Sequence, residues 1–368
     1  MRPPLITEAR PTAKALRRVP AWKPAVALAA ALACGGCRAA YVGRLAYEEA
    51  RFLCSARPAT ELLASAQNPE QRKALEALLD VRDFAAREGL DVGGSYREVA
   101  DVASASPFHV VTAAWADRLE PYTWWYPVVG SIPYRGYFDR ASADAFAAGL
   151  AAEGLDTLVV EASAYSTLGW FDDPLPSSVL DRGDGAVVVT VLHELVHQTF
   201  FAKGQVAFNE TLATDIAWRL AEKYFASKGE DARAAKARAA REAFLARSDV
   251  LDAAAARLRA FFDDARAKGE PREAMLAARG ALYGEVLADV TRVDPGFAKD
   301  LAGGRLDNAS FLAAHRYASG ARAIDAFVAA SPGVAGALGR LKDAQARKVD
   351  LVAFVAFVAG SAPRRPAS

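Results

Sequence analysis

The sequence predicts an α+β fold that is mostly helical, with a small β-sheet ahead of a helix that carries a His-Glu-x-x-His motif and a helical C-terminal half. Apolar residues recur at helical spacing from residue 41 to about 88 and again from 229 to 350. Residues 108–138 are instead rich in β-branched and aromatic side chains, interrupted by glycine and proline, which is typical of short strands joined by tight turns. A chain of 368 residues is long enough to bury a large core around these elements.

Individual elements follow from capping and breaking residues. Asn68-Pro69 is a typical start of a helix and Gly89 a typical end, while Asp139 is expected to cap a helix that runs to about Glu153. The further expected elements are a strand at 158–162, a loop at 170–176, helices at 186–202 and 209–227, and a packed apolar helix at 349–359. That last segment is too short to cross a membrane, because a spanning helix needs about 20 residues.

Composition excludes several classes of protein. Lys plus Arg number 45 and Asp plus Glu number 44, so the net charge is +1 and no basic surplus points to nucleic-acid binding. Three cysteines are too few for a disulfide scaffold or a cysteine-rich metal cluster. The mixed charges of residues 228–241 are those of a solvated helix face, so no protein partner is inferred.

The N-terminal segment resembles an export signal. Six basic residues against one acid precede the apolar run Ala25–Ala33, which small residues follow. Cys34 or Cys37 could then accept a lipid, as in a bacterial lipoprotein, and anchor the protein to a membrane surface. We therefore expect an exported protein on the periplasmic side of the cell envelope. The alternative is a plain secreted protein with incidental cysteines.

These observations divide the chain into four parts. Residues 1–37 are the targeting segment, and residues 38–228 hold the N-terminal helices, the small sheet and the motif helix. Residues 229–361 form a helical region that completes a cleft, and residues 362–368 are expected to be a disordered tail.

The motif His193-Glu194-Leu-Val-His197 carries the chemistry. On a helix, positions i and i+4 share a face, so both imidazoles can bind one metal ion at about 2.0–2.1 Å. Glu194 lies about 100° further round the helix, where it can reach a water on the metal and act as a general base. The motif is otherwise surrounded by valine and leucine, and a metal would satisfy all three buried polar groups.

A catalytic zinc needs a third protein ligand and an open position for water. Glu210 is the expected ligand, because Gly204 permits a turn and Asn209 is a good N-cap for the helix that follows. Asp215 is the rival, but it lies about 140° further round that helix and cannot face the same ion. The sequence therefore predicts one zinc ion per chain, bound by His193, His197 and Glu210.

Together with the motif and Phe208-Asn-Glu210, three stretches give the chain a resemblance to a known family. The most specific are Pro127-Val-Val-Gly-Ser-Ile-Pro-Tyr-Arg-Gly-Tyr-Phe-Asp139 and Ala164-Tyr-Ser-Thr-Leu-Gly-Trp-Phe-Asp-Asp-Pro-Leu175, with a weaker match from Asn308 to Tyr317. They resemble the bacterial putative aminopeptidases of the zincin type. The resemblance implies a gluzincin-type fold and site, with His193, His197 and Glu210 on zinc and Glu194 as the base. The Gly-x-Met-Glu-Asn element with which the best-known zinc aminopeptidases of this kind bind the substrate's amino terminus is absent.

Hydrolysis by such a site also requires a donor for the oxyanion. Tyr317 is our candidate catalytic donor, with Tyr165 and His315 as alternatives. Arg135 could bind a substrate carboxylate, or form a structural ion pair with Asp139 or with an acid in the loop at 172–173. Asp172 and Asp173 could bind a free amino terminus, or could simply form the turn before Pro174.

The sequence thus predicts a zinc-dependent peptidase that hydrolyses peptide substrates outside the cytoplasm. Two alternatives stay open: a non-catalytic zinc-binding envelope lipoprotein that acts as a scaffold, and a zinc amidase that acts on cell-wall peptides.

Overall fold

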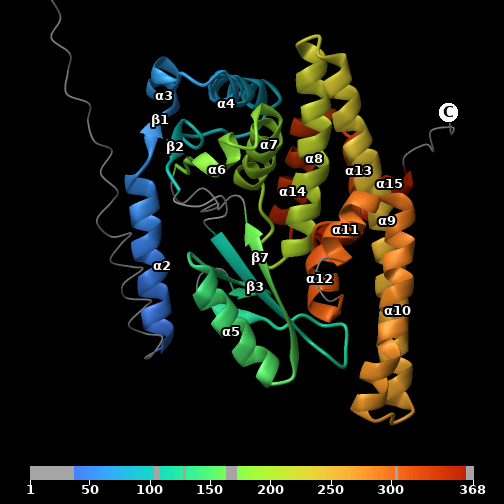
Figure 1. Cartoon of the computed structure of the whole chain (residues 1–368). Coiled ribbons are helices and arrows are strands. Elements are labelled where there is room, and N and C mark those ends of the chain that lie inside the picture. The colour runs from blue at the N-terminus through green and yellow to red at the C-terminus, as the bar shows by residue number, and fades with distance from the viewer. Residues whose placement is uncertain (1–36, 103–107, 127–129, 163–171, 303–305, 362–368) are drawn as a thin grey trace, which may run out of the picture. The chain divides into compact units, whose positions relative to one another are not determined.

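A computed structural model describes residues 37–102, 108–126, 130–162, 172–302 and 306–361 of the chain (Figure 1). Contacts divide the chain into two units, residues 1–50 and 51–368. The described residues of the first unit belong to helix α2 (Cys37–Cys54), whose last turn lies in the second unit. Cys34 and the tail at 362–368 lie outside the described residues. No described helix is both long and apolar enough to cross a membrane.

The fold is α+β and mostly helical, as the sequence predicts. The helices of the second unit are α3 (Ala59–Ser65), α4 (Pro69–Arg87), α5 (Arg140–Ala152), α6 (Ser177–Leu180), α7 (Asp184–Thr199), α8 (Val206–Ser227), α9 (Asp231–Ala267), α10 (Arg272–Val293), α11 (Pro295–Ala302), α12 (Asn308–Arg316), α13 (Ala321–Ala329), α14 (Gly333–Ala346) and α15 (Leu351–Ser361). The strands are β1 (Arg57–Pro58), β2 (Glu98–Ala100), β3 (Phe108–Trp115), β4 (Trp124–Tyr126), β5 (Gly130–Ile132), β6 (Arg135–Tyr137), β7 (Leu155–Ala162) and β8 (Leu175–Pro176).

The expected helical region before Gly89 consists of three helices, because β1 separates α2 from α3 and a short break precedes α4. The predicted cap of α4 is confirmed: the Asn68 side chain accepts a hydrogen bond from the Glu70 N–H at 2.9 Å. The predicted end is confirmed too, since Gly89 has a φ of +85° just beyond α4.

The main sheet is small and antiparallel, with β3 between β6 and β7. Val110 of β3 pairs with Gly136 on one side and with Val160 on the other. Helix α5 packs on this sheet, and Figure 1 shows it lying along β3 and β7. Asp139 caps α5 as predicted, since its carboxylate accepts the Ser142 N–H at 2.8 Å. Two smaller sheets have the strand orders β1-β2-β8 and β4-β5.

The largest hydrophobic core lies around α7, which α4 and α8 flank. Leu192 and Leu195 of α7 are completely buried there, together with Leu78 of α4 and Ile216 of α8. Helices α13 and α14 contribute side chains to the same core. Burying both sides of α7 fixes its rotation about its own axis, and this determines where the motif residues lie.

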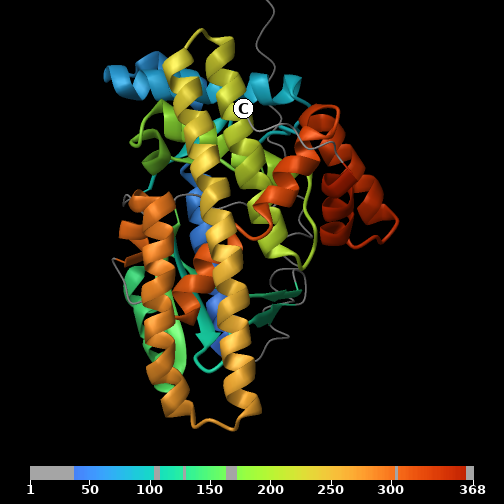
Figure 2. The ribbon, with the colours of Figure 1, turned by 90° about the vertical axis from the view of Figure 1, so that its right-hand side faces the viewer.

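A second core lies between α9 and α10, which run side by side as a long antiparallel pair (Figure 2). Phe244 and Phe262 of α9 and Tyr283 of α10 are buried in it. Phe311 of α12 is fully buried in the same core, so the α9–α10 pair supports α12.

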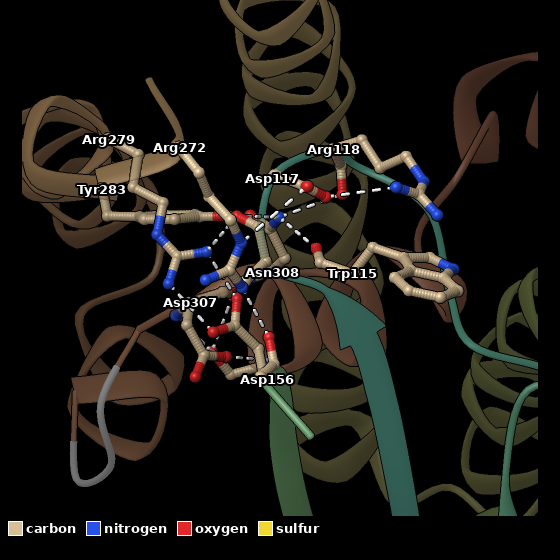
Figure 3. Close-up of polar contacts among 12 residues, drawn as sticks. Trp115, Asp117, Arg118, Asp156, Arg272, Arg279, Tyr283, Asp307 and Asn308 are labelled. Atoms are coloured by element: carbon tan, nitrogen blue, oxygen red, sulfur yellow. Dashed lines mark hydrogen bonds and ion pairs between the residues drawn. The ribbon is translucent and has the colours of Figure 1, made fainter. Parts of the chain in front are cut away.

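A buried polar network fixes the first turn of α12 (Figure 3). The Asn308 side-chain amide donates to the backbone oxygens of Trp115 and Arg118 at 2.7 and 3.0 Å. The Tyr283 hydroxyl donates to the side-chain oxygen of Asn308. The Arg279 guanidinium binds both carboxylate oxygens of Asp156, at 2.6 and 2.9 Å. The network therefore ties the ends of β3 and β7 to α10 and α12.

Candidate metal centre

The motif helix α7 leads directly to the third expected ligand. After α7 ends at Thr199, a short connection turns at Gly204, whose φ is +77°, and α8 begins at Val206. Asn209 is therefore not the N-cap that the sequence suggested, because α8 begins one turn earlier. Its buried side-chain amide instead accepts from the Ala202 N–H at 2.8 Å and donates to the Ala202 oxygen at 2.9 Å. This pair of bonds closes the connection and holds the first turns of α8 beside α7.

Three side chains converge where these helices meet. His193 Nε2 and His197 Nε2 lie 3.2 Å apart, and Glu210 Oε2 lies 3.4 Å from the first and 3.6 Å from the second. Ligands of a tetrahedral zinc ion with bonds of about 2.0–2.1 Å are separated by about 3.3–3.4 Å. The donor set of two imidazoles and one carboxylate, and the size of this triangle, therefore fit a zinc ion.

Electrostatics at Glu210 agree with this role. Burial acts to raise the pKa of Glu210, but the hydrogen-bonding contacts with His193 and His197 lower it well below its usual value. Glu210 is thus a carboxylate at neutral pH, which is the form that binds a cation.

Glu194 lies beside the triangle and is not one of its corners. Burial, together with the charges of Glu210 and Asp173, raises the pKa of Glu194 to about 7 against the opposing charge of His193. A carboxylate with a pKa near neutrality can both take up and release a proton at physiological pH, as a general base must.

Tyr317 follows the last residue of α12. Tyr317 as a whole is 46% exposed. Burial of its hydroxyl and the nearby charge of Glu210 nevertheless raise the pKa of the phenol. The phenol therefore stays protonated and is available as a hydrogen-bond donor. The alternative His315 lies elsewhere, stacked on Phe311 and 2.7 Å from Asp252, whereas Tyr165 lies outside the described residues.

A second phenol, Tyr134, was not among the sequence-based candidates. Burial raises its pKa, and the charges of Glu210 and Glu194 act in the same direction. Tyr134 stands between β5 and β6, within the 127–139 stretch that carries the family resemblance. The family resemblance of that stretch was the only sequence signal for Tyr134, because no rule of residue spacing connects it to the His-Glu-x-x-His motif.

Of the two candidate acids before Pro174, Asp173 is buried and Asp172 is exposed. The Asp173 backbone N–H donates to Ser95 Oγ at 3.2 Å, and the Asp173 backbone carbonyl oxygen accepts from the Tyr96 N–H at 2.7 Å. The negative charge of Asp173 also raises the pKa of Glu194.

The remaining candidates lie away from the triangle. Asp215 is fully buried near Arg219 and Arg241, at 3.7 and 3.9 Å, and is not among the converging ligands. The Arg135 guanidinium lies over the Phe146 ring, 4.4 Å from its centroid. These positions agree with the expectation that Asp215 and Glu210 face different directions.

Comparison with known proteins gives one match. The model of a protein family described as putative aminopeptidase matches residues 40–338, which include every side chain of this site. No curated protein and no solved structure matches the chain.

Proposed function

Because the chain belongs to the putative aminopeptidase family, we propose that it is a zinc-dependent peptidase with a gluzincin-type site. The observation that carries this proposal is the triangle of His193, His197 and Glu210, with Glu194 on the same helix as the two imidazoles. A single zinc ion held by these three residues would leave a coordination position open for water.

Zinc, when bound, would lower the pKa of a coordinated water and polarise the substrate carbonyl. Glu194 would then accept a proton from the attacking water and deliver it to the leaving amine, which its raised pKa permits. Tyr317, or its neighbour Tyr134, would donate a hydrogen bond to the carbonyl oxygen as negative charge develops there.

Aminopeptidase action also requires recognition of a free amino terminus. Asp173 is the candidate, because it is buried and its negative charge reaches Glu194. An α-ammonium group close to Asp173 would place the first peptide bond of a substrate beside the base. The proposal therefore includes cleavage from the amino terminus, with Asp173 in place of the Gly-x-Met-Glu-Asn element that this sequence lacks.

Export to the periplasmic side, with a lipid on Cys34 or Cys37, remains part of the proposal. It rests on the basic and apolar pattern of the N-terminal segment alone. Mass spectrometry of the protein from bacterial membranes would detect the modified cysteine, and an unmodified cysteine at both positions would contradict the anchor.

The proposed function is tested with two variants of the full chain, purified without chelators. Glu210→Ala should lose zinc, measured by elemental analysis, because removing a direct ligand costs more than the roughly 10- to 100-fold that an outer-shell partner costs. Glu194→Gln should keep near-stoichiometric zinc and lose hydrolysis of a peptide library. The control is Glu76→Gln, an exposed residue of α4. A folded wild type that takes up no zinc, or a Glu194→Gln protein that still cleaves peptides, would contradict the proposal.

A further inference from the structure

Arg316 is the last residue of α12 and lies next to Tyr317 in the chain. Its partly buried guanidinium donates to the Thr112 hydroxyl at 3.2 Å and stacks over the Tyr134 ring, 5.5 Å from the centroid. Among the described residues no carboxylate lies within ion-pair distance of it. A guanidinium has five N–H donors, so its contacts with the described residues use only part of its hydrogen-bonding capacity.

Backbone contacts place Arg316 at the metal centre. The Thr211 hydroxyl donates to the Arg316 carbonyl oxygen at 3.5 Å, and Thr211 directly follows the ligand Glu210 on α8. The charge of Arg316 also lowers the pKa of Tyr134 and Tyr317, opposing burial and the charges of Glu210 and Glu194. Both phenols are therefore within electrostatic reach of the proposed ligand Glu210 and of this guanidinium.

Several other buried or half-buried arginines among the described residues form ion pairs. Arg279 binds Asp156, Arg219 and Arg241 both bind Asp325, and Arg247 binds Asp294. Burying a charge costs free energy unless the charge is paired, so a half-buried guanidinium without a carboxylate partner is a candidate for binding an anion. An arginine fork matches the geometry of a carboxylate, which it can bind through two parallel hydrogen bonds.

The candidate of opposite charge is Asp173. Its negative charge acts on Glu194, whereas the positive charge of Arg316 acts on the two phenols, so charges of both signs act on the proposed reacting groups. A short free peptide has the complementary charges, an ammonium group at one end and a carboxylate at the other.

We propose that Arg316 binds the free C-terminal carboxylate of a short peptide whose amino terminus faces Asp173, so that the substrates are small unblocked peptides rather than protein chains. The inference rests on the proposed function, because it assigns a substrate class to the same site. Thr112 and Tyr134 would hold the guanidinium ready, since both already contact it in the free protein.

The test compares two substrates that differ only in the terminal charge, trialanine and trialanine amide. Hydrogen bonds to charged groups contribute about 1.5–3 kcal/mol, so kcat/KM for the free acid should exceed that for the amide at least about tenfold, mainly through KM. Arg316→Met should reduce this ratio to near one, and Arg316→Lys should keep part of it. The control Arg322→Met should keep the full ratio, because Arg322 pairs with Asp249 on an exposed surface.

Binding provides a readout that does not depend on turnover. Calorimetry on zinc-loaded Glu194→Gln should give tighter binding of trialanine than of its amide, and the double variant with Arg316→Met should lose that difference. Equal cleavage and equal binding of the two peptides by wild-type Arg316 would overturn the inference while leaving the peptidase intact. Absence of any cleavage by the wild type, with the binding difference present, would instead contradict the proposed function.

Discussion

The Nε2 atom of His315 lies 2.7 Å from Oδ1 of Asp252, and the second oxygen of the same carboxylate accepts from the Gly320 N–H at 3.0 Å. One carboxylate on α9 therefore holds both ends of the turn that carries Tyr317. Ser248, one turn earlier on α9, donates to the Ala318 oxygen and accepts from the Ala321 N–H. The turn depends on Gly320, whose φ of +70° is in the left-handed region that favours glycine.

These contacts of Asp252 predict that it positions Tyr317. Asp252→Asn should lower kcat several-fold with little change in KM and with zinc retained, because a displaced phenol fails mainly in the transition state. Asp249→Asn is the matched control, since Asp249 lies on the same helix and pairs with the exposed Arg322. A parallel loss of zinc or of thermal stability in Asp252→Asn would point to a general structural role instead.

The two phenols are expected to differ in importance. Removing one oxyanion donor costs on the order of 10²- to 10³-fold in kcat, so Tyr317→Phe should show a loss of that size with KM nearly unchanged. Tyr134→Phe should have the smaller effect on kcat if Tyr317 is the donor. Steady-state kinetics on one peptide measures both variants, and the reverse order would assign the role to Tyr134.

Asn308 is expected to be important for stability rather than for chemistry. It is completely buried, and its amide donates to the oxygens of Trp115, Ala116 and Arg118. Each buried polar group left without a partner costs about 1–3 kcal/mol, so Asn308→Ala should lower the free energy of unfolding by about 3 kcal/mol or more. Urea unfolding measures this change. Asn68→Ala, which removes only the cap of α4, should cost about 1 kcal/mol.

The buried carboxyl group of Asp215 is expected to make the stability of the fold depend on pH. Burial raises the pKa of Asp215 above its usual value of 3.8, and the charge of Asp325 adds to this effect against Arg219 and Arg241. Above pH 4 the unfolded chain has released this proton while the folded chain still holds it, so the contribution of Asp215 to stability falls as pH rises toward the folded pKa. The stability of Asp215→Asn relative to wild type should therefore increase between pH 5 and pH 8. Urea titrations at both pH values measure the difference, and a relative stability that decreases instead would show that the arginines dominate.

Much of the fold follows from local sequence. The cap at Asn68, the cap at Asp139 and the end of α4 near Gly89 depend on residues next to each other in the chain, so local propensity was enough. The start of α8 was misjudged, because Asn209 is a good cap by type but makes its hydrogen bonds to Ala202 instead. Tertiary structure decides these hydrogen-bond partners, because they depend on how the connection between α7 and α8 closes.

The spacing of His193, Glu194 and His197 by itself determined which side chains share a helix face, because 3.6 residues per turn leave no freedom in that relationship. The nearby Glu210 could be nominated from the same short stretch. Only the tertiary structure decided that its carboxylate lies 3.4 Å from His193 and that the Arg316 guanidinium lies over the Tyr134 ring, beside Thr112. Tyr134 lies between β5 and β6, and Arg316 ends α12. The packing of these elements into separate cores, not sequence spacing, brings the two residues together.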